Sequence, residues 1–363
     1  MRDYTGSTIF LGMDVHKLTY SVTAICDGVI IKRDTIIADH MELISYCKRF
    51  FPNAKIKSAY EAGFCGFGLH RNLLADGIEN IVVHPASIEV MANDRIKNDK
   101  RDSLKIASQL SAGRLKGIFV PTIKQEAYRS ISRQRDTFAK EKTRASNRLK
   151  GFLYYHGLFV TSTRMSKKFI KSLRALEISD DLRFSLYQLI SVWEFFNEKI
   201  ETCSNKLEEQ AKSDNLETIY RSVPGIGSTL ARVLSNELGD MSHFLSEKDL
   251  FSFCGFTPIE YSSGESIRRG HMSRQGKSIL RKGLTQAAWI AIKRDKSLEE
   301  VYRRIAVRGG GKKAIQAVAR KLVGRIRACV RNNKNYECKE IQLKEESSPE
   351  KSFCQDLVYV SCG

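Results

Sequence analysis

The sequence contains no run of eighteen apolar residues, so we expect no membrane span. Its first residues, MRDYTGSTIFLGMD, are too polar for a secretory signal. The nine cysteines lie singly without any C-x-x-C pair, which favours free thiols in a reducing cytosol over a disulfide frame or a zinc site. The GGGKKA segment at 309–314 lacks the spacing and the hydroxyl residue of a P-loop. These absences predict a cytoplasmic protein without a P-loop nucleotide site.

Acidic residues are scarce relative to basic ones. The chain has 60 Lys and Arg against 41 Asp and Glu, a formal net charge of +19 and a pI near 9.5. Residues 264–331 hold 19 of the basic residues against four acids, and residues 124–150 hold nine against three. Such an excess indicates a polyanionic partner, with nucleic acid as the first choice.

Residues 1–121 read as one α/β domain. TIFLGMDVH and TYSVTAIC predict strands, and the Asp-Gly pair before VIIKRDTII is a hairpin signal. KIKSAYEAG and IENIVVHP predict two more strands, separated by a helix over GFGLHRNLLADG and followed by a helix over DSLKIASQLSAGRL. A hairpin followed by strands alternating with helices predicts a mixed sheet.

The rest of the chain reads as mainly helical. Residues 122–215 contain two long helical patterns joined by a basic loop, which predicts either an antiparallel coiled-coil arm or an ordinary helical hairpin. Residues 216–335 form a further helical domain. The polar residues 336–363, with the segment KEESSPEKS, predict a disordered tail.

The segment SVPGIGSTLARVLSNELGD resembles the second half of a helix-hairpin-helix element. Gly225 and Gly227 precede its apolar helix. Backbone amides at such a helix start can bind a phosphate without reading sequence. Taken alone, a Gly-x-Gly turn is a weak signal, because such turns are common in other settings.

Four carboxylates stand out by their positions. Asp14 and Glu61 end predicted strands, and Asp99 and Asp102 begin a predicted helix, three residues apart on one face. Acids at the ends of neighbouring strands meet at one sheet edge, and hard oxygen ligands suit Mg²⁺ or Mn²⁺. Alternatively, Asp99 and Asp102 only favour a helix start, and the other two are exposed strand ends. The ordered set of four in a basic chain favours a metal site.

The order of the motifs resembles the DEDD transposases of the insertion-sequence "one-ten" family, which are relatives of the Piv DNA invertase. The matching pieces run from about residue 8 to 331 and include FLGMDVHK, YEAGFCG, KNDKRDS, LFSFCGFTPIEYSSGES, RRGHMSRQGKSILRKGLTQAAW and AIQAVARKLV. This resemblance implies a RuvC-like domain of RNase H fold, a coiled-coil segment and a C-terminal transposase domain. It also implies an enzyme that recombines donor and target DNA with a structured bridge RNA as its guide.

The resemblance also implies roles for individual residues. Asp14, Glu61, Asp99 and Asp102 match the family's metal-binding tetrad. Ser263, followed by Gly264, matches the proposed nucleophile, and its neighbour Ser262 remains an alternative. A hydroxyl needs activation, and a bound divalent ion can provide it and also neutralise the phosphate. The residues expected to contact nucleic acid are Arg268, Arg269, Arg274, Lys277 and Arg281, with Gly225 and Gly227.

Three functions remain open at this point. The first is an RNA-guided recombinase with a phosphoserine intermediate, the second a RuvC-like junction nuclease that uses metal-activated water, and the third a non-catalytic nucleic-acid-binding protein. The complete tetrad disfavours the third, and the Ser-Gly context disfavours the second. Because exchange of two duplexes requires four strand cuts, we expect a dimer or tetramer. We also expect it to act in the cytoplasm of a prokaryote, associated with the nucleoid.

Overall fold

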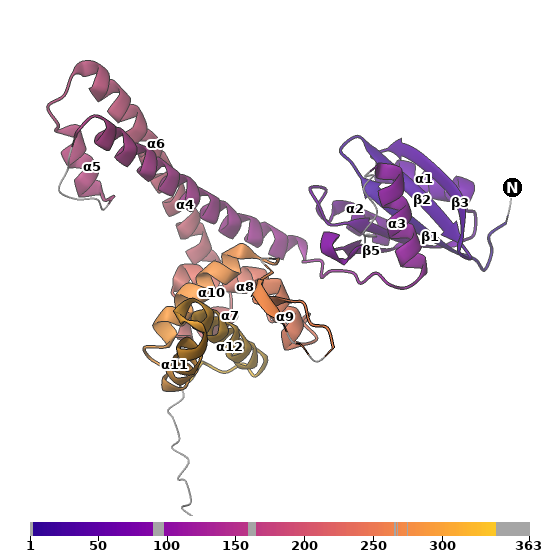
Figure 1. Cartoon of the computed structure of the whole chain (residues 1–363). Helices are drawn as coiled ribbons and strands as arrows, with labels where there is room; N and C mark the ends of the chain where they lie inside the picture. Colours follow the sequence, from indigo (N-terminus) through magenta and orange to yellow (C-terminus); the bar gives the residue numbers. More distant parts are fainter. Residues whose placement is uncertain are drawn as a thin grey trace, which may run out of the picture. The chain divides into compact units, whose positions relative to one another are not determined.

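A computed structural model describes residues 3–89, 98–158, 165–264, 266, 268–273 and 275–338, without the side chain of Arg269. The chain divides into two compact units, residues 1–122 and 123–363. Each unit is described by itself. Figure 1 shows the sheet in the first unit and the helices of the second.

The first unit is built on one mixed sheet with the strand order β3-β2-β1-β4-β5. The strands are β1 (Thr8–Val15), β2 (Thr19–Cys26), β3 (Val29–Ile37), β4 (Lys55–Glu61) and β5 (Glu79–Val83). The first three pair antiparallel, whereas β4 lies parallel to β1 and β5 lies parallel to β4. The predicted α/β region with a hairpin and a mixed sheet is confirmed.

Helices cover both faces of this sheet. On one face, α1 (His40–Phe50) and α2 (Gly68–Ala75) close the core, which contains Ile9, Leu11 and Met13 of β1. Helix α3 (Asp99–Ser111) packs on β1, β2 and β4, and Figure 1 shows it crossing the sheet. Side chains alternate between faces along a strand, so Gly12 and Asp14 belong to the face opposite Leu11 and Met13. That face is the one that α3 covers.

Two long helices begin the second unit, α4 (Ile123–Tyr155) and α6 (Asp180–Ala211), with the short α5 (Lys167–Arg174) beside their distal ends. Contacts join Arg135 to Ser204 and Lys142 to Asn197, so the two helices run antiparallel. A small apolar core near α5 includes Leu149, Ile190, Phe169 and other buried side chains. The predicted helical arm is therefore present, while its coiled-coil geometry stays a prediction.

The remaining helices share one core. They are α7 (Leu216–Ser222), α8 (Ser228–Leu238), α9 (Glu247–Cys254), α10 (Ser278–Ala291), α11 (Lys296–Gly309) and α12 (Gly311–Arg331). A two-stranded hairpin of β6 (Pro258–Glu260) and β7 (Arg269–Met272) lies between α9 and α10 in the sequence. Tyr336, which the sequence analysis assigned to the tail, is buried and its hydroxyl donates to Asp295 at 2.8 Å. The remainder of the predicted tail, residues 339–363, lies outside the described residues.

Two arginines at the base of the arm attach α4 to α8. Arg129 donates to the main-chain carbonyls of Asn236 and Glu237, which lie at the end of α8 where helix carbonyls lack intrahelical partners. Arg133 forms a bidentate pair with the fully buried Glu237 carboxylate, at 2.6 and 2.8 Å. These contacts fix the orientation of the arm within the second unit.

Candidate metal centre and serine hairpin

The carboxyl ends of β1 and β4 place Asp14 and Glu61 at the same edge of the sheet. The strands are parallel, and Met13 pairs with Tyr60, so the next residue of each strand is an acid. By the alternation of side chains along a strand, both acids belong to the face of the sheet that α3 covers. The sequence prediction that these two strand ends lie at one edge is confirmed.

Gly12 determines how closely α3 approaches this edge. A Cβ at this position would lie 2.2 Å from Ala107 N and 2.3 Å from Ser103 O, so only glycine admits the helix backbone. A buried hydrogen bond of 2.9 Å between the hydroxyls of Thr23 and Ser103 supports the same contact. Because the helix seats two residues before Asp14, its first turn lies beside the sheet edge.

The first turn of α3 supplies the second pair of acids. The Asn98 side chain caps the helix by accepting from Arg101 N at 2.9 Å, and Asp99 and Asp102 follow it. The predicted helix start is confirmed. Asp102 forms an ion pair of 3.2 Å with Lys105, one turn further along.

Three donor atoms converge at this edge, and one of them belongs to a residue that the sequence analysis missed. His16 Nε2 lies 3.2 Å from Asp14 Oδ2 and 3.1 Å from Asp99 Oδ2. Among the described residues, Asp14, His16 and Asp99 form a group whose donor atoms all lie within 4.8 Å of one another. Glu61 and Asp102 are not in this group. The i, i+2 spacing in Asp14-Val15-His16 was the signal available, since it puts both side chains on one face of a strand.

The electrostatics of the edge favour a cation. Partial burial raises the pKa of Asp14, and the charges of Asp99 and Asp102 raise it further, whereas His16 opposes the shift. Carboxylates held this close repel one another unless a positive charge lies among them. Oxygen and imidazole donors also form a chemically suitable set for a divalent ion. The residues present therefore fit a metal such as Mg²⁺ or Mn²⁺.

Ser263 lies in the tip of the β6–β7 hairpin. Its main chain exchanges two hydrogen bonds of 3.2 Å with Ser266, which closes a two-residue turn that begins with Gly264 at φ +58°. Positive φ at this position is typical of tight hairpin turns and suits glycine. Ser263 is exposed, and its hydroxyl has no hydrogen-bonding partner among the described residues.

The neighbouring Ser262 has partners in the hairpin itself. Its hydroxyl donates to Glu260 Oε1 at 2.9 Å and accepts from Arg268 N at 3.3 Å. Arg268 is exposed close to the serines. The side chain of Arg269 and the whole of Arg274 lie outside the described residues. Ser262 is thus held within the hairpin by its hydroxyl, whereas no described residue forms a hydrogen bond with the hydroxyl of Ser263.

The hairpin is held at its base by close main-chain packing. Lys277 N donates to Phe253 O at 2.9 Å. A Cβ at Gly255 would lie 2.1 Å from Arg281 Nη1, which is buried. Arg281, predicted to bind nucleic acid, therefore packs against the hairpin base through this nitrogen.

Lys277 lies in a positive environment. Although the residue is exposed, desolvation of the ammonium group lowers its pKa, and Arg133 and Arg129 lower it further against the opposing effect of Glu237. Several cations thus meet near the start of α10, where they would attract a polyanion.

The two glycines of the predicted phosphate-binding turn have different surroundings. Gly225 packs against α10, since a Cβ there would lie 2.7 Å from Ala287 O and 2.9 Å from Ile290 Cβ. Gly227 precedes α8 and has open space on its Cβ side. Gly225 is therefore explained by helix packing. The helix-hairpin-helix assignment stays a prediction.

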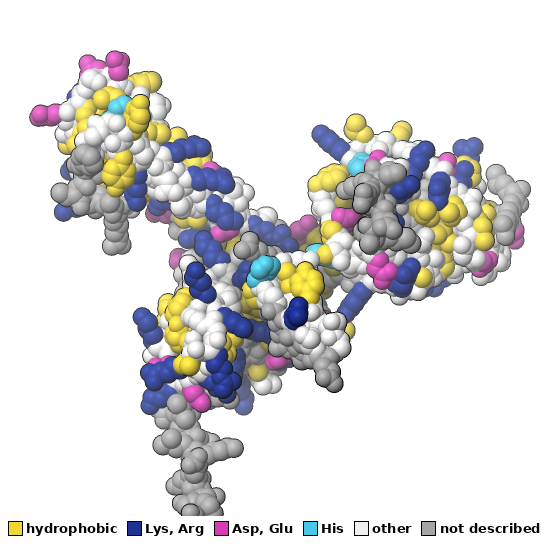
Figure 2. Space-filling view, viewed as in Figure 1, with side chains coloured by type: hydrophobic (Ala, Val, Ile, Leu, Met, Phe, Trp, Pro, Cys, Tyr) yellow, Lys and Arg dark blue, Asp and Glu magenta, His cyan; other side chains and the backbone are white. Residues whose placement is uncertain are grey.

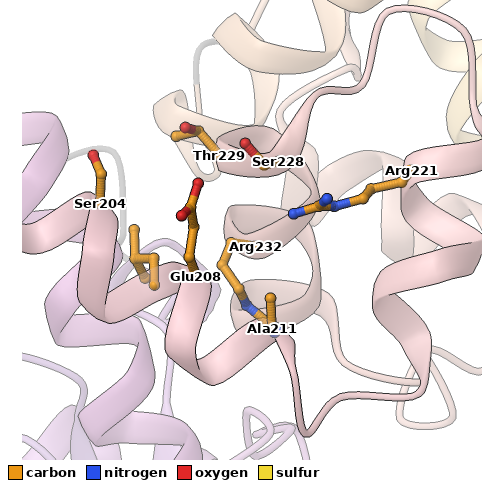
Figure 3. A pocket seen from close by; sticks show the side chains of 8 residues that line it. Ser204, Glu208, Ala211, Arg221, Ser228, Thr229 and Arg232 are labelled. Carbon is orange, nitrogen blue, oxygen red and sulfur yellow. The ribbon is translucent and has the colours of Figure 1, made fainter.

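A small cavity lies between α6, α7 and the N-terminus of α8 (Figure 3). It measures about 20 Å³, room for about one water molecule. Buried Arg232 lies 3.1 Å from Glu217 Oε2 and donates to Asp214 Oδ2 at 2.5 Å. Figure 3 shows Arg221 and Glu208 on opposite sides of the space. Glu208 lines this cavity, and Arg232 is already paired with Asp214 and Glu217, so the cavity is a poor phosphate site. These ion pairs stabilise the junction of α6, α7 and α8.

Basic side chains cover much of the second unit. Figure 2 shows Lys and Arg along the arm and over the region of α11 and α12. Among the described residues, no helix is long and apolar enough to cross a membrane.

Comparisons with known proteins agree with this arrangement. A family described as DEDD transposase of the IS110 type matches residues 11–156, and the Transposase IS116/IS110/IS902 family matches residues 217–303. The chain is 27% identical over 301 residues to the transposase for insertion sequence element IS1533 of Leptospira borgpetersenii, covering 77% of this chain and 84% of that one. It is 24% identical over 286 residues to the transposase for IS1111A of Coxiella burnetii, covering 76% and 78%. In two relatives from Sinorhizobium fredii, the match spans 57% and 66% of the relative's length, which is less than two thirds.

Proposed function

Because the chain belongs to the IS116/IS110/IS902 family of transposases, we propose that it cuts and rejoins DNA strands at the ends of an insertion sequence. The observation that carries this proposal is the meeting of Asp14, His16 and Asp99 at the sheet edge, in the unit that matches the DEDD family. Acids clustered in this way repel one another, and a bound cation would offset that repulsion.

We assign divalent metal binding to this edge, with Asp14, Glu61, Asp99 and Asp102 as the acids. When bound, Mg²⁺ or Mn²⁺ would neutralise the scissile phosphate and lower the pKa of an oxygen nucleophile. These acids would hold the ion at the sheet edge, where α3 is seated through Gly12 and brings its first turn beside β1. Asp102→Ala should abolish strand cutting and leave most DNA binding, which the basic surfaces supply.

We assign the nucleophile to Ser263. Its Oγ would attack the scissile phosphorus and form a phosphoserine bond as the bond from phosphorus to one deoxyribose oxygen breaks. The leaving oxygen takes up the proton as a hydroxyl, and a hydroxyl of the other DNA strand later reverses the step. The energy of the phosphodiester is kept, so joining needs no ATP. The exposed position of Ser263 on a firmly based hairpin supports this assignment.

The second candidate function is a metal-dependent nuclease in which water attacks and Ser263 is idle. Two observations favour it. The grouped donors Asp14, His16 and Asp99 all lie in the first unit, and no described residue accepts a hydrogen bond from the Ser263 hydroxyl to take its proton. Denaturing electrophoresis after incubation with labelled donor DNA and Mg²⁺ separates the two functions. Label that migrates with the protein supports the serine pathway, whereas free label without an adduct supports the nuclease.

We propose that the nucleic acid is contacted near the serine by Arg268, Arg269, Arg274 and Lys277. The basic arm and the basic surface of the last helices would contact it further from the serine. The positive environment of Lys277 supports this arrangement. Each neutralised phosphate releases counterion, so log K should fall by about 0.7–0.9 per contact with log salt. A binding constant that is flat between low and high salt would overturn the assignment.

We also propose that a structured RNA guides the enzyme and that at least two chains cooperate. The basic surfaces support an RNA partner, and sequencing of copurified RNA, with loss of recombination after RNase treatment, tests it. Because the metal site and Ser263 lie in different units, one chain's serine can complete another chain's metal site. A mixture of Ser263→Ala and Asp102→Ala proteins should then regain activity. Continued inactivity despite proven subunit mixing would exclude the shared site.

A further inference from the structure

His16 lies among the acids at the metal edge, although the four-acid pattern does not include it. It follows Asp14 by two residues, just beyond the end of β1, and its main-chain N–H donates to Thr19 O at 2.9 Å. This bond closes the turn between β1 and β2 and fixes the backbone of His16 beside the strand end. The backbone that carries the imidazole is therefore fixed at the edge of the sheet.

The contacts of His16 Nε2 differ from those of an ordinary ion pair. The atom is buried, and its short distances to Asp14 and Asp99, 3.2 and 3.1 Å, do not have the direction of N–H···O hydrogen bonds. The two oxygens lie beside the axis along which the ring nitrogen would donate. A buried nitrogen without a directed bond needs an explanation, and a cation bound by this nitrogen and the two anionic oxygens supplies one.

Neighbouring ligands of one cation have this arrangement. In octahedral coordination with bonds of about 2.1 Å, adjacent ligand atoms lie about 3.0 Å apart and each sees its neighbour well off its own bond axis. The two observed separations, 3.1 and 3.2 Å, are close to this value. Asp14 and Asp99 also come from different elements, β1 and α3, so the three atoms surround a point at their junction.

We propose that His16 is a direct nitrogen ligand of the divalent ion and makes this site selective for Mn²⁺ over Mg²⁺. Mg²⁺ is a hard ion that takes oxygen ligands, whereas imidazole donors suit first-row transition ions. An all-oxygen set of four acids would give no such preference. This inference rests on the metal site of the proposed function and adds a residue and a selectivity to it.

The experiment uses the full chain, freed of nucleic acid and metal, at one fixed pH. Binding of Mn²⁺ is followed by electron paramagnetic resonance, and binding of Mg²⁺ by its competition with Mn²⁺. The variants are His16→Asn, which keeps a polar side chain of smaller reach, and Asp14→Ala. His156→Asn is the matched control, because His156 is exposed on the arm in the other unit.

The parent and the His156 control should bind Mn²⁺ equally, with hyperfine coupling to an imidazole nitrogen in the spectrum of the bound ion. His16→Asn should lose that coupling and bind Mn²⁺ about tenfold or more weakly, the scale at which even supporting partners of metal ligands act. Its Mg²⁺ affinity should change by less than about threefold. Far-ultraviolet circular dichroism, unchanged from the parent, shows that the variant is folded.

Two results separate failure of this inference from failure of the metal site. If the parent binds Mn²⁺ without nitrogen coupling, and Asp14→Ala loses it, the metal site stands and His16 is not a ligand. If the parent and Asp14→Ala bind Mn²⁺ equally weakly, the edge is not a metal site and both proposals fall. Equal losses of Mn²⁺ and Mg²⁺ affinity in His16→Asn would overturn the selectivity.

Discussion

Replacing Gly12 by Ala should separate the two halves of the metal edge. The new methyl group would meet main-chain atoms of α3 at 2.2 and 2.3 Å, where ordinary contacts lie near 3.5 Å. Neither atom is the end of a flexible side chain, so the helix itself must move by about 1 Å. Forced overpacking of this kind costs about 1–3 kcal/mol.

The expected cost gives a measurable change in the local opening of α3. At about 2 kcal/mol, and with 1.4 kcal/mol for each factor of ten, amide protection in residues 99–111 should fall by about 30-fold. Hydrogen exchange with mass spectrometry of the full chain measures it directly. Displacement of Asp99 from Asp14 should also weaken Mn²⁺ binding by about tenfold or more.

Gly68 provides the matched control. It begins α2 in the same unit, and a Cβ there would have no atom within 4 Å. Gly68→Ala should leave α3 protection and metal affinity unchanged, since alanine is the better helix former. If Gly12→Ala also leaves both unchanged, the close seat of α3 on β1 is not what assembles the site, and the reasoning is wrong.

Three further results are expected. Ser263→Ala should abolish the covalent protein–DNA adduct while Ser262→Ala keeps it, as seen by denaturing electrophoresis; an adduct in the first variant would move the nucleophile elsewhere. Arg133→Gln should destabilise the second unit by about 3 kcal/mol in chemical unfolding, because it leaves the buried carboxylate of Glu237 with only part of its pairing. The control Arg183→Gln removes an exposed ion pair and should change the free energy of unfolding by less than about 1 kcal/mol. Equal effects of the two substitutions would contradict the structural role of the Arg133–Glu237 pair. The raised pKa of Asp14 means that the metal-free folded chain binds this proton at higher pH than the unfolded chain does. The melting temperature of the parent, relative to that of Asp14→Asn, should therefore rise as pH falls from above the raised folded-state pKa toward the unfolded value. Parallel pH profiles of the two proteins would show that folding does not raise the pKa of Asp14.

The sequence alone determined the local elements. Alternation and the Asp-Gly turn identified the hairpin of β1 to β3, and the helical arm followed from long patterns without proline. Asp14, Glu61, Asp99 and Asp102 were found because strand ends and helix starts can be read from neighbouring residues. These features depend on interactions within a few residues, which the sequence displays directly.

Only the tertiary structure decided which of these side chains meet. It brought His16 between Asp14 and Asp99, because the β1–β2 turn and the first turn of α3 converge where Gly12 lets the helix approach. It also placed Tyr336 in the core through a hydroxyl bond to Asp295. Such contacts join residues dozens of positions apart, and they depend on side-chain volumes and backbone approach. The i, i+2 spacing of Asp14 and His16 is a local signal, but no local pattern shows that both meet Asp99 or that Gly12 is the glycine that admits a helix.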